Sequence, residues 1–189
     1  MISAILLAAG QSKRMNGENK LTKEIQGIPL IKLSVKNILA SSVDKLIIVL
    51  GYQKKIIENL IDKNDKIKFV FNKDFENGMA SSIRMGLSHL PENTEAFFIC
   101  LGDMPMVSSD IYNQLIESKN RKDILVPIYK NLQGNPVLFS ISMKDKIKTV
   151  EGDVGAKKII DMNKDKILFF ETNDISVTKD FNTKDNFNN

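Results

Sequence analysis

Short apolar segments alternate along this chain with segments whose apolar residues recur at helical spacing. The apolar segments have the length of sheet strands, and they predict strands at Ile2–Leu7, Lys45–Leu50, Ile67–Phe71, Ala96–Leu101, Ile124–Pro127 and Lys166–Phe170. The segments between them predict helices at Leu30–Ala40, Gln53–Asp62, Met79–Leu90, Ser108–Ser118, Ser140–Ile147 and Val154–Met162. This alternation is typical of βαβ units, so the sequence predicts an α/β fold.

The predicted strands are apolar at nearly every position rather than at alternate positions. Strands of this kind are buried on both faces, which indicates a mostly parallel sheet between two layers of helices. No internal repeat and no linker divides the sequence. We therefore predict a single domain over residues 1–181, followed by a polar, frayed tail over residues 182–189.

Composition places the chain among ordinary globular proteins. Of its 189 residues, 42% are hydrophobic and 26% are charged, and no apolar run approaches the ~20 residues of a membrane helix. No charged stretch precedes the first apolar run, so we expect no secretory signal, a cytoplasmic location and no membrane partner. The net charge of +4 is spread along the chain, which favours an anionic small molecule over nucleic acid as a partner.

Several kinds of chemistry are missing from the sequence. The single cysteine, Cys100, excludes an internal disulfide and a cysteine-rich zinc site, and we expect it to be buried. The single histidine, His89, stands just before Pro91 and leaves no basis for a histidine triad. Neither the P-loop pattern nor the dinucleotide pattern Gly-x-Gly-x-x-Gly is present.

The first strand leads directly into small residues. Ala8, Ala9 and Gly10 follow it, and the loop beyond them carries Arg14 and Lys20. Small residues allow the backbone to lie close to a ligand, and successive N–H groups in such a turn bind anions. Because the carboxyl ends of parallel strands are where ligands bind in such sheets, this loop predicts a triphosphate site.

A second strand-end feature is Leu101-Gly102-Asp103-Met104-Pro105. Asp103 follows an apolar strand after one glycine, so its carboxylate is held on a rigid element with room for a ligand. A single carboxylate beside phosphates is a natural Mg²⁺ ligand. The alternative interpretation is a turn aspartate before Pro105.

Three further segments carry polar or small residues at predicted element ends. In Gly78-Met79-Ala80-Ser81-Ser82-Ile83 the hydroxyls either cap a helix or meet a phosphate or base. Asn72 closes the preceding strand and is the nearest side chain able to contact a base edge. The segment Gly134-Asn135-Pro136-Val137 predicts a tight turn leading into a strand, and Asp153 either caps a helix or contacts a ligand.

Taken in order, these motifs resemble a known family. Leu7-Ala8-Ala9-Gly10-x-Ser12-x-Arg14-Met15 with Lys20 resembles the signature of MobA-like nucleotidyltransferases. The segments at 78–83, 101–105, 134–137 and 152–157 are similar to those of the molybdenum cofactor cytidylyltransferases that serve xanthine dehydrogenase-type enzymes. The resemblance runs from residue 1 to about residue 181.

The resemblance implies a Rossmann-like three-layer sandwich of the nucleotide-diphospho-sugar transferase type. It implies transfer of CMP from CTP to molybdopterin carrying molybdenum, with release of pyrophosphate. Mg²⁺ is the implied metal, with Mn²⁺ as an alternative. The implied small-molecule partners are CTP and the molybdopterin cofactor, and a molybdoenzyme or its maturation chaperone is the candidate protein partner.

The residues and the resemblance together predict a complete site. The predicted catalytic residues are Arg14, Lys20 and Asp103. The predicted nucleotide-binding residues are Leu7, Ala8, Ala9, Gly10, Ser12, Arg14, Lys20, Asn72, Ser81, Ser82, Gly102 and Asp103. The predicted acceptor-binding residues are Met79, Gly134, Asn135, Asp153 and Gly155. The predicted metal ligands are Asp103 and Asp174.

The chain departs from the family pattern at Ser176, which replaces the second aspartate of the tail pattern Asp-Ile-Asp-Thr-Pro-x-Asp. Either Asp174 or a water molecule then replaces that carboxylate, or metal binding is weaker. Two other functions compete with cytidylyl transfer to molybdopterin. One is nucleotidyl transfer to a sugar phosphate or another pterin, and the other is non-catalytic binding and delivery of the cofactor.

Overall fold

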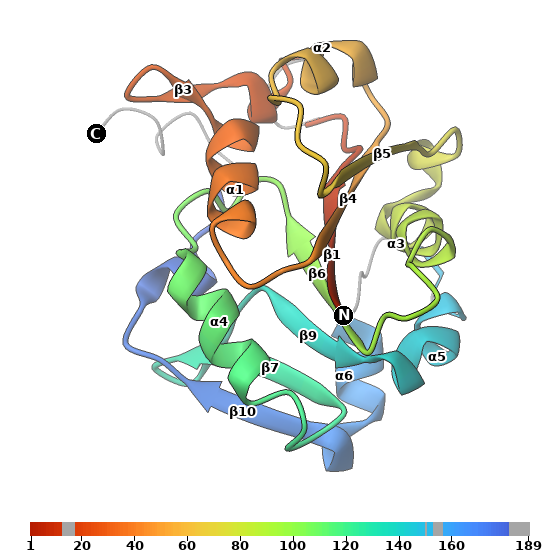
Figure 1. Cartoon of the computed structure of the whole chain (residues 1–189), viewed down its shortest axis with the longest axis vertical. Helices are drawn as coiled ribbons and strands as arrows, with labels where there is room; N and C mark the ends of the chain where they lie inside the picture. Colours follow the sequence, from red (N-terminus) through yellow and green to blue (C-terminus); the bar gives the residue numbers. More distant parts are fainter. Residues whose placement is uncertain (13–17, 150, 153–156, 182–189) are drawn as a thin grey trace.

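The computed structural model describes residues 1–12, 18–149, 151–152 and 157–181. In these residues the chain forms an eight-stranded sheet with the order β10-β7-β9-β6-β1-β4-β5, in which β8 pairs with β7 (Figure 1). The strands of this sheet are β1 Ile2–Ala8, β4 Lys45–Leu50, β5 Ile67–Phe71, β6 Ala96–Leu101, β7 Ile124–Tyr129, β8 Leu132–Gln133, β9 Val137–Ser140 and β10 Ile167–Glu171.

Helices and a small hairpin surround the sheet. The α-helices of the described residues are α1 Leu30–Leu39, α2 Lys54–Asn59, α3 Met79–Ser88, α4 Ser109–Glu117, α5 Lys144–Lys148 and α6 Lys157–Met162. The hairpin strands are β2 Glu24–Ile25 and β3 Ile28–Pro29, and the 3₁₀ turns are η2 Lys20–Thr22, η3 Phe75–Asn77, η4 Ile141–Met143, η5 Lys164–Lys166 and η6 Ile175–Thr178. The predicted tail, 182–189, lies outside the described residues, so the domain boundary at residue 181 stays a prediction.

All six predicted strands are present, and the sheet is mostly parallel, as predicted. The strands β6, β1, β4 and β5 run parallel to one another, and β10 runs parallel to β7. The exceptions are β9, which is antiparallel to β6 and β7, and the short β8, which is antiparallel to β7. The predicted helix at Ser140–Ile147 was wrong in its first residues, because Ser140 ends β9 and α5 begins only at Lys144.

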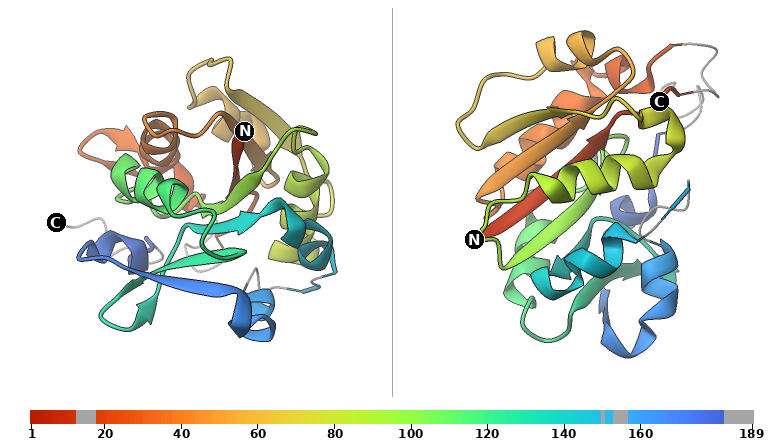
Figure 2. Two further views of the ribbon diagram at one scale, coloured as in Figure 1. Left: turned by 60° about the horizontal axis from the view of Figure 1, so that its bottom comes forward. Right: turned by 90° about the vertical axis from the view of Figure 1, so that its right-hand side faces the viewer.

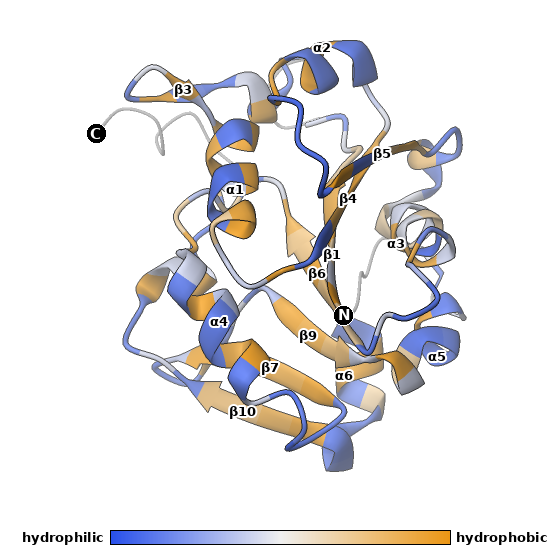
Figure 3. Ribbon diagram, in the orientation of Figure 1, coloured by the Kyte–Doolittle hydropathy of each residue, from blue (hydrophilic) through white to orange (hydrophobic). Residues whose placement is uncertain are grey.

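Both faces of the sheet are covered, which gives the expected three layers (Figures 1 and 2). One core joins Leu6, Leu46 and Phe98 of the sheet to the buried faces of α1 and α4. The other joins Ile5, Phe97 and neighbouring sheet residues to α3, α5 and α6. Successive residues of a strand point to opposite faces, so continuous apolar strands fill both cores, and the hydrophobic colour of the sheet shows this (Figure 3).

Two buried details show how tightly these layers pack. Gly86 of α3 lies so close to β1 that a side-chain Cβ there would stand 2.3 Å from Ile5 Cγ2. Cys100 is buried beside Tyr112, and this burial raises the pKa of the Cys100 thiol to about 12. The cysteine is therefore a core residue, as the sequence predicts.

None of the helices in the described residues has the length and apolar character that crossing a bilayer requires.

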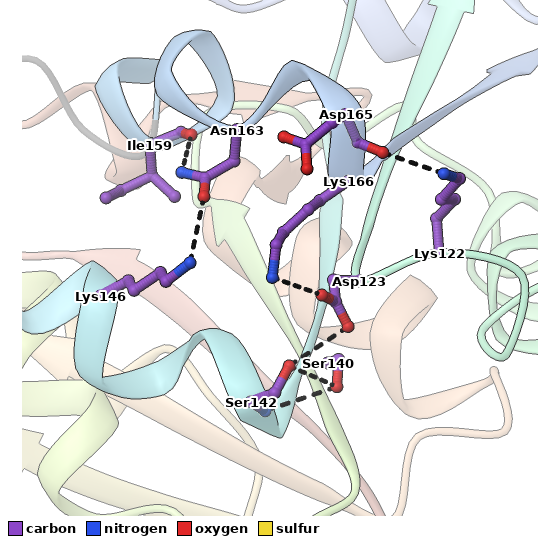
Figure 4. A network of polar contacts seen from close by, with 9 residues as sticks. All are labelled: Lys122, Asp123, Ser140, Ser142, Lys146, Ile159, Asn163, Asp165 and Lys166. Atoms are coloured by element: carbon purple, nitrogen blue, oxygen red, sulfur yellow. Dashed lines mark hydrogen bonds and ion pairs between the residues drawn. The ribbon is translucent and has the colours of Figure 1, made fainter.

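Polar contacts tie together the amino ends of β7 and β10, where Figure 4 shows a network around Asp123. Lys166 Nζ lies 3.1 Å from Asp123 Oδ2, and Ser142 donates a hydrogen bond to Asp123 Oδ1. The hydrogen bond to Asp123 raises the pKa of Lys166. Lys122 Nζ donates to the main-chain oxygen of Asp165. Asp123 and Lys166 pair with each other, and these contacts join the start of β7 to the start of β10 at the edge of the sheet.

The strand order places a topological switch point beside β1. The chain leaves β1 for β4 and β5 on one side and returns to β6 on the other. Ligands of such sheets bind outside the carboxyl ends of the strands at this point. The segments that follow β1 and β6 are the loop after Ala8 and the segment containing Asp103.

Candidate functional site: a nucleotide cleft at the switch point

A cleft of about 830 Å³ opens at the carboxyl ends of β1 and β6. Its walls come from the loop after β1, the segment after β6, the start of α3 and the chain beyond η6. The lining residues that had been predicted as site residues are Leu7, Ala9, Gly10, Ser12, Lys20, Met79, Ser82 and Asp103. The other lining residues are Gln11, Leu21, Phe75, Glu76, Asn77, Gly78, Leu101, Gly152 and Asp180.

Lys20 and Asp103 meet inside this cleft as a hydrogen-bonded ion pair between Lys20 Nζ and Asp103 Oδ2. The two residues are 83 positions apart in the sequence. Asp103 is only 8% exposed, and a carboxylate removed from water needs a positive partner. The cleft therefore holds a positive and a negative group in direct contact.

Backbone contacts fix the position of Asp103. The N–H of Gly102 donates to the carbonyl of Leu7 over 3.1 Å, which joins the segment to β1. The hydroxyl of Ser34, on α1, donates to the carbonyl of Gly102 over 3.0 Å. The carbonyl of Asp103 itself accepts from the N–H of Phe181 over 2.9 Å. Three separate parts of the chain therefore hold the main chain of Gly102 and Asp103, and no local pattern in the sequence pointed to Ser34 or Phe181.

The loop after β1 is closed at its base. Ser12 Oγ accepts a hydrogen bond of 3.0 Å from the N–H of Lys20. Asn19 Oδ1 accepts from the N–H of Leu21 and caps the turn η2. These contacts place the side chain of Lys20 at the cleft. The predicted catalytic residue Arg14 lies in the segment 13–17, outside the described residues.

The far wall of the cleft contains residues that sequence analysis did not assign. Gln11 Nε2 donates to Glu76 Oε1 over 2.9 Å, so the first loop and the turn η3 are joined across the cleft. Gly51 lies behind this wall, where an added Cβ would stand 2.7 Å from the Ala9 oxygen and 2.8 Å from Phe75 Cβ. Glu76 belongs to the segment between a strand and a helix, and its place there was the one signal that could have found it.

Asn72 and Ser81 lie beside the cleft and outside its lining. Asn72 is 1% exposed, and its Nδ2 donates to the hydroxyls of Ser81 and Ser82 over 2.8 and 3.1 Å. Asn72 Oδ1 accepts from the N–H of Asp74. The Ser81 hydroxyl hydrogen-bonds to the carbonyls of Asp74 and Gly78. Asn72 therefore ties the end of β5 to the start of α3, which forms one wall of the cleft.

We expect Asn72→Ala to lower the free energy of unfolding by about 2 kcal/mol, because the substitution leaves buried donors and acceptors without a partner. Urea denaturation followed by circular dichroism measures this loss. Asn77→Ala, an exposed residue of η3, is the control and should change stability by less than about 0.5 kcal/mol. An Asn72→Ala protein as stable as the wild type would contradict the structural role.

The remaining predicted residues divide into three groups. Ala8 and Gly102 are buried beneath the cleft. Gly134 and Asn135 bond elsewhere, since their N–H groups donate to Pro127 and Val177 carbonyls over 2.8 Å each. Asp153 and Gly155 lie outside the described residues, although the adjacent Gly152 lines the cleft and its carbonyl accepts from the N–H of Ala80.

Asp174, predicted as a metal ligand, is outside the cleft lining, and its Oδ1 accepts from the N–H of Ser176 as a cap of η6. Ser176 is buried, and its hydroxyl has no hydrogen-bond partner among the described residues. The chain then turns so that Asp180, the last acid of the same tail pattern, lines the cleft together with Asp103. Of these two acids of the tail pattern, Asp180 therefore lies at the cleft and Asp174 does not, and Glu76 is a further carboxylate of the lining.

The donor set of the cleft fits a hard divalent cation. Asp103 and Asp180 supply carboxylate oxygens, and the described residues contain no group of three or more His, Cys, Asp or Glu that could enclose a metal. Mg²⁺ commonly uses one or two carboxylates and takes its other ligands from water and substrate phosphates. This arrangement suits a metal that is held jointly by the protein and a nucleotide.

The fold and the strand-end site together define a nucleotidyltransferase of the nucleotide-diphospho-sugar transferase type. The MobA-like NTP transferase domain matches residues 4–167, and the chain belongs to this family. It is 29% identical over 139 residues to the molybdenum cofactor cytidylyltransferase of Escherichia coli, covering 74% of this chain and 70% of that protein. It is 30% identical over 159 residues to a probable molybdenum cofactor guanylyltransferase of Methanosarcina acetivorans, covering 80% and 69%.

Solved structures agree with this fold. The crystal structure of Rv0371c from Mycobacterium tuberculosis superposes with a TM-score of 0.89 at 24% identity, covering 98% of this chain and 94% of that one. A second crystal structure of Rv0371c, a complex with manganese, has a TM-score of 0.82 at 20% identity and covers 98% and 95%. These likenesses establish the architecture.

Proposed function

We propose that this protein transfers CMP from CTP to the phosphate of molybdopterin carrying molybdenum, with release of pyrophosphate. The observation that carries the proposal is the meeting of Lys20 and Asp103 in a cleft at the switch point of the sheet. A cation for phosphates and a carboxylate for a metal are what nucleotidyl transfer requires. The cofactor maturation role, for xanthine dehydrogenase-type enzymes in the cytoplasm, belongs to the same proposal.

The proposed reaction forms one P–O bond and breaks one. An oxygen of the acceptor phosphate attacks the α-phosphorus of CTP, and the bond from that phosphorus to the bridging oxygen of pyrophosphate breaks. The attacking phosphate is already ionised near neutral pH, so the site needs no strong general base. Catalysis in such reactions comes from positioning and charge neutralisation, which matches a cleft without histidine.

Each described residue then has a specific task. Lys20, together with the predicted Arg14, holds the β- and γ-phosphates and stabilises the departing pyrophosphate. Asp103 holds Mg²⁺, and Asp180 and Glu76 are further carboxylates of the cleft lining. Mg²⁺, when bound, supplies positive charge to the phosphate oxygens around the reacting phosphorus. Gly10 and the N–H groups near it approach the phosphates closely.

Selection of CTP is proposed from Ala9. The sequence identity of the whole chain is nearly the same with the cytidylyl relative as with the guanylyl relative. Overall similarity therefore does not decide which base is selected. Cytidylyl members of the family resemble this chain in having alanine at this position, where guanylyl members usually have glycine. Ala9 lines the cleft next to Gly51 and Phe75, and we expect its methyl group to leave less room for a purine than a glycine would.

The test is pyrophosphate release across the four nucleoside triphosphates, with and without purified molybdopterin cofactor. We expect release that requires both CTP and the cofactor. Release with CTP and a different phosphorylated acceptor would identify another transferase, and binding of the cofactor without any release would identify a delivery protein. Either result would overturn the proposed function.

Lys20→Ala is expected to raise the KM for CTP by about tenfold, because the substitution removes a charged contact to the triphosphate. Initial rates at several CTP concentrations and saturating Mg²⁺ measure this change. Lys23→Ala is the matched control, since the Lys23 ammonium pairs with Glu18 at 2.5 Å and is outside the cleft lining. An unchanged KM in Lys20→Ala would remove this lysine from the nucleotide site.

A further inference from the structure

We propose that the ammonium of Lys20 and the divalent metal compete for the carboxylate of Asp103, so that metal binds this carboxylate more tightly once a nucleotide triphosphate draws Lys20 away. This inference rests on the proposed function and adds an order to it. Lys20 is then an internal cation that holds the metal ligand until substrate arrives.

The ion pair itself is the first support. Lys20 Nζ contacts Asp103 Oδ2, one of the two oxygens through which a metal would bind. The Asp103 side chain is 12% exposed and the Lys20 side chain 22%, so water screens the pair only in part. A second cation at the same oxygen would be within a few ångströms of the ammonium, and like charges at that distance repel strongly. Occupancy by one cation therefore weakens binding of the other.

The two partners differ in how firmly they are held. The main chain of Asp103 is fixed through its own carbonyl and through Gly102, and the short aspartate side chain keeps the carboxylate near that fixed main chain. Lys20 is fixed at its N–H by Ser12, but its ammonium is carried on a flexible four-carbon stem. The exchange needs only a swing of this side chain. The lysine leaves and the carboxylate remains.

A triphosphate supplies what the exchange requires. Lys20 and Asp103 line the same cleft as Gly10 and Ser12 of the first loop. Phosphates on this loop offer the ammonium several anionic oxygens, and they also bring oxygen ligands for the metal. The nucleotide therefore lowers the cost of separating the pair and raises the affinity for metal at Asp103 in a single event.

The experiment measures Mn²⁺ binding to the full chain without nucleotide, by the electron paramagnetic resonance signal of free Mn²⁺. We expect Lys20→Met to bind Mn²⁺ at least about fivefold more tightly than wild type, the change that removal of a modest ion pair gives. Lys20→Arg keeps the cation and should remain as weak as wild type. The double variant Lys20→Met/Asp103→Asn should lose the gain, because the competed carboxylate is gone.

A second measurement separates competition from a merely structural role. Binding of CTP in the presence of EDTA, by calorimetry, should be at least about fivefold weaker in Lys20→Met. Opposite changes in affinity for metal and nucleotide support the proposal, whereas weaker binding of both overturns it. Lys23→Gln should alter neither affinity. An unchanged Mn²⁺ affinity in Lys20→Met also overturns it.

Failure of the competition between Lys20 and metal can be distinguished from failure of the proposed function. If wild type releases pyrophosphate from CTP while Lys20→Met shows no gain in Mn²⁺ affinity, the competition fails and the transferase function stands. If Lys20→Met gains Mn²⁺ affinity but no nucleotide yields pyrophosphate with the cofactor, the proposed reaction is wrong. The competition of Lys20 and metal for Asp103 is then still supported.

Discussion

Asp103→Asn is expected to lower the rate of pyrophosphate release by at least about 100-fold, a loss of roughly 2.7 kcal/mol of transition-state stabilisation, by analogy with removal of a key electrostatic group. The asparagine has nearly the same shape but carries no charge, so it binds Mg²⁺ poorly and also removes the ion pair between Lys20 and Asp103. Steady-state rates with saturating CTP, cofactor and Mg²⁺ provide the measurement.

The fold should survive this substitution, because the segment is held through backbone groups. The carbonyls of Gly102 and Asp103 accept from Ser34 and Phe181, and neither bond involves the carboxylate. Asp110→Asn is the control: it removes an exposed carboxylate a few residues along the chain, on α4, and should leave the rate unchanged. A folded Asp103→Asn protein with a rate within tenfold of wild type would exclude Asp103 as the metal ligand.

Gly134→Ala should lower the free energy of unfolding by about 3 kcal/mol, the upper part of the range for overpacking a filled site. An added Cβ would stand 2.4 Å from the carbonyl oxygen of Val177 and 2.8 Å from its carbonyl carbon. These are backbone atoms, and that oxygen also accepts from the N–H of Asn135. The substitution would push η6 off β7 and β8, and thermal or urea unfolding measures the cost.

Gly10→Ala is the matched control for stability, since no atom of the described residues lies within 4 Å of an added Cβ at Gly10. We expect its free energy of unfolding to change by less than about 0.5 kcal/mol. The comparison also tests the predicted role of Gly134 in acceptor binding. If Gly134→Ala is as stable as wild type and only the KM for the cofactor rises, Gly134 acts by direct contact with the acceptor.

Asp103→Asn and Gly134→Ala both concern the chain that follows η6. Displacement of η6 in Gly134→Ala would also move Asp180 and Phe181, because they come next in the chain. Phe181 donates to the carbonyl of Asp103, and Asp180 lines the cleft. A fall in activity beyond the loss of folded protein would therefore show that the C-terminal segment supports the metal side of the cleft from a distance.

Some of the chemistry was predictable because it is local in sequence. An apolar strand followed by Ala8, Ala9 and Gly10, and another followed by Gly102 and Asp103, indicate a ligand site wherever parallel strands end. The turn at Gly134–Val137 also predicted that a strand follows it, but neither the end nor the direction of this strand, β9, could be derived from local residues, and Ser140 was assigned to the next helix. Antiparallel pairing with β6 and β7 decides that Val137–Ser140 is a strand.

The direction in which a polar side chain points could not be predicted from the neighbouring residues in the sequence. Asn72 was expected to face a base, yet it is buried against Ser81 and Ser82. Asp174 and Asp180 belong to one acidic pattern, and only Asp180 lines the cleft. In both cases the residue type and its place after a strand were compatible with either direction. Packing against neighbouring elements determines whether each side chain points toward the cleft or away from it.

The sequence by itself determined the α/β class, the mostly parallel sheet and the family, because strand-length apolar segments and strand-end motifs are written in consecutive residues. Tertiary structure alone decided which polar groups meet, since Lys20 and Asp103 are brought together by the pairing of β1 with β6. Such contacts depend on strand order and on the packing of whole elements, and neither is encoded in any short segment of the chain.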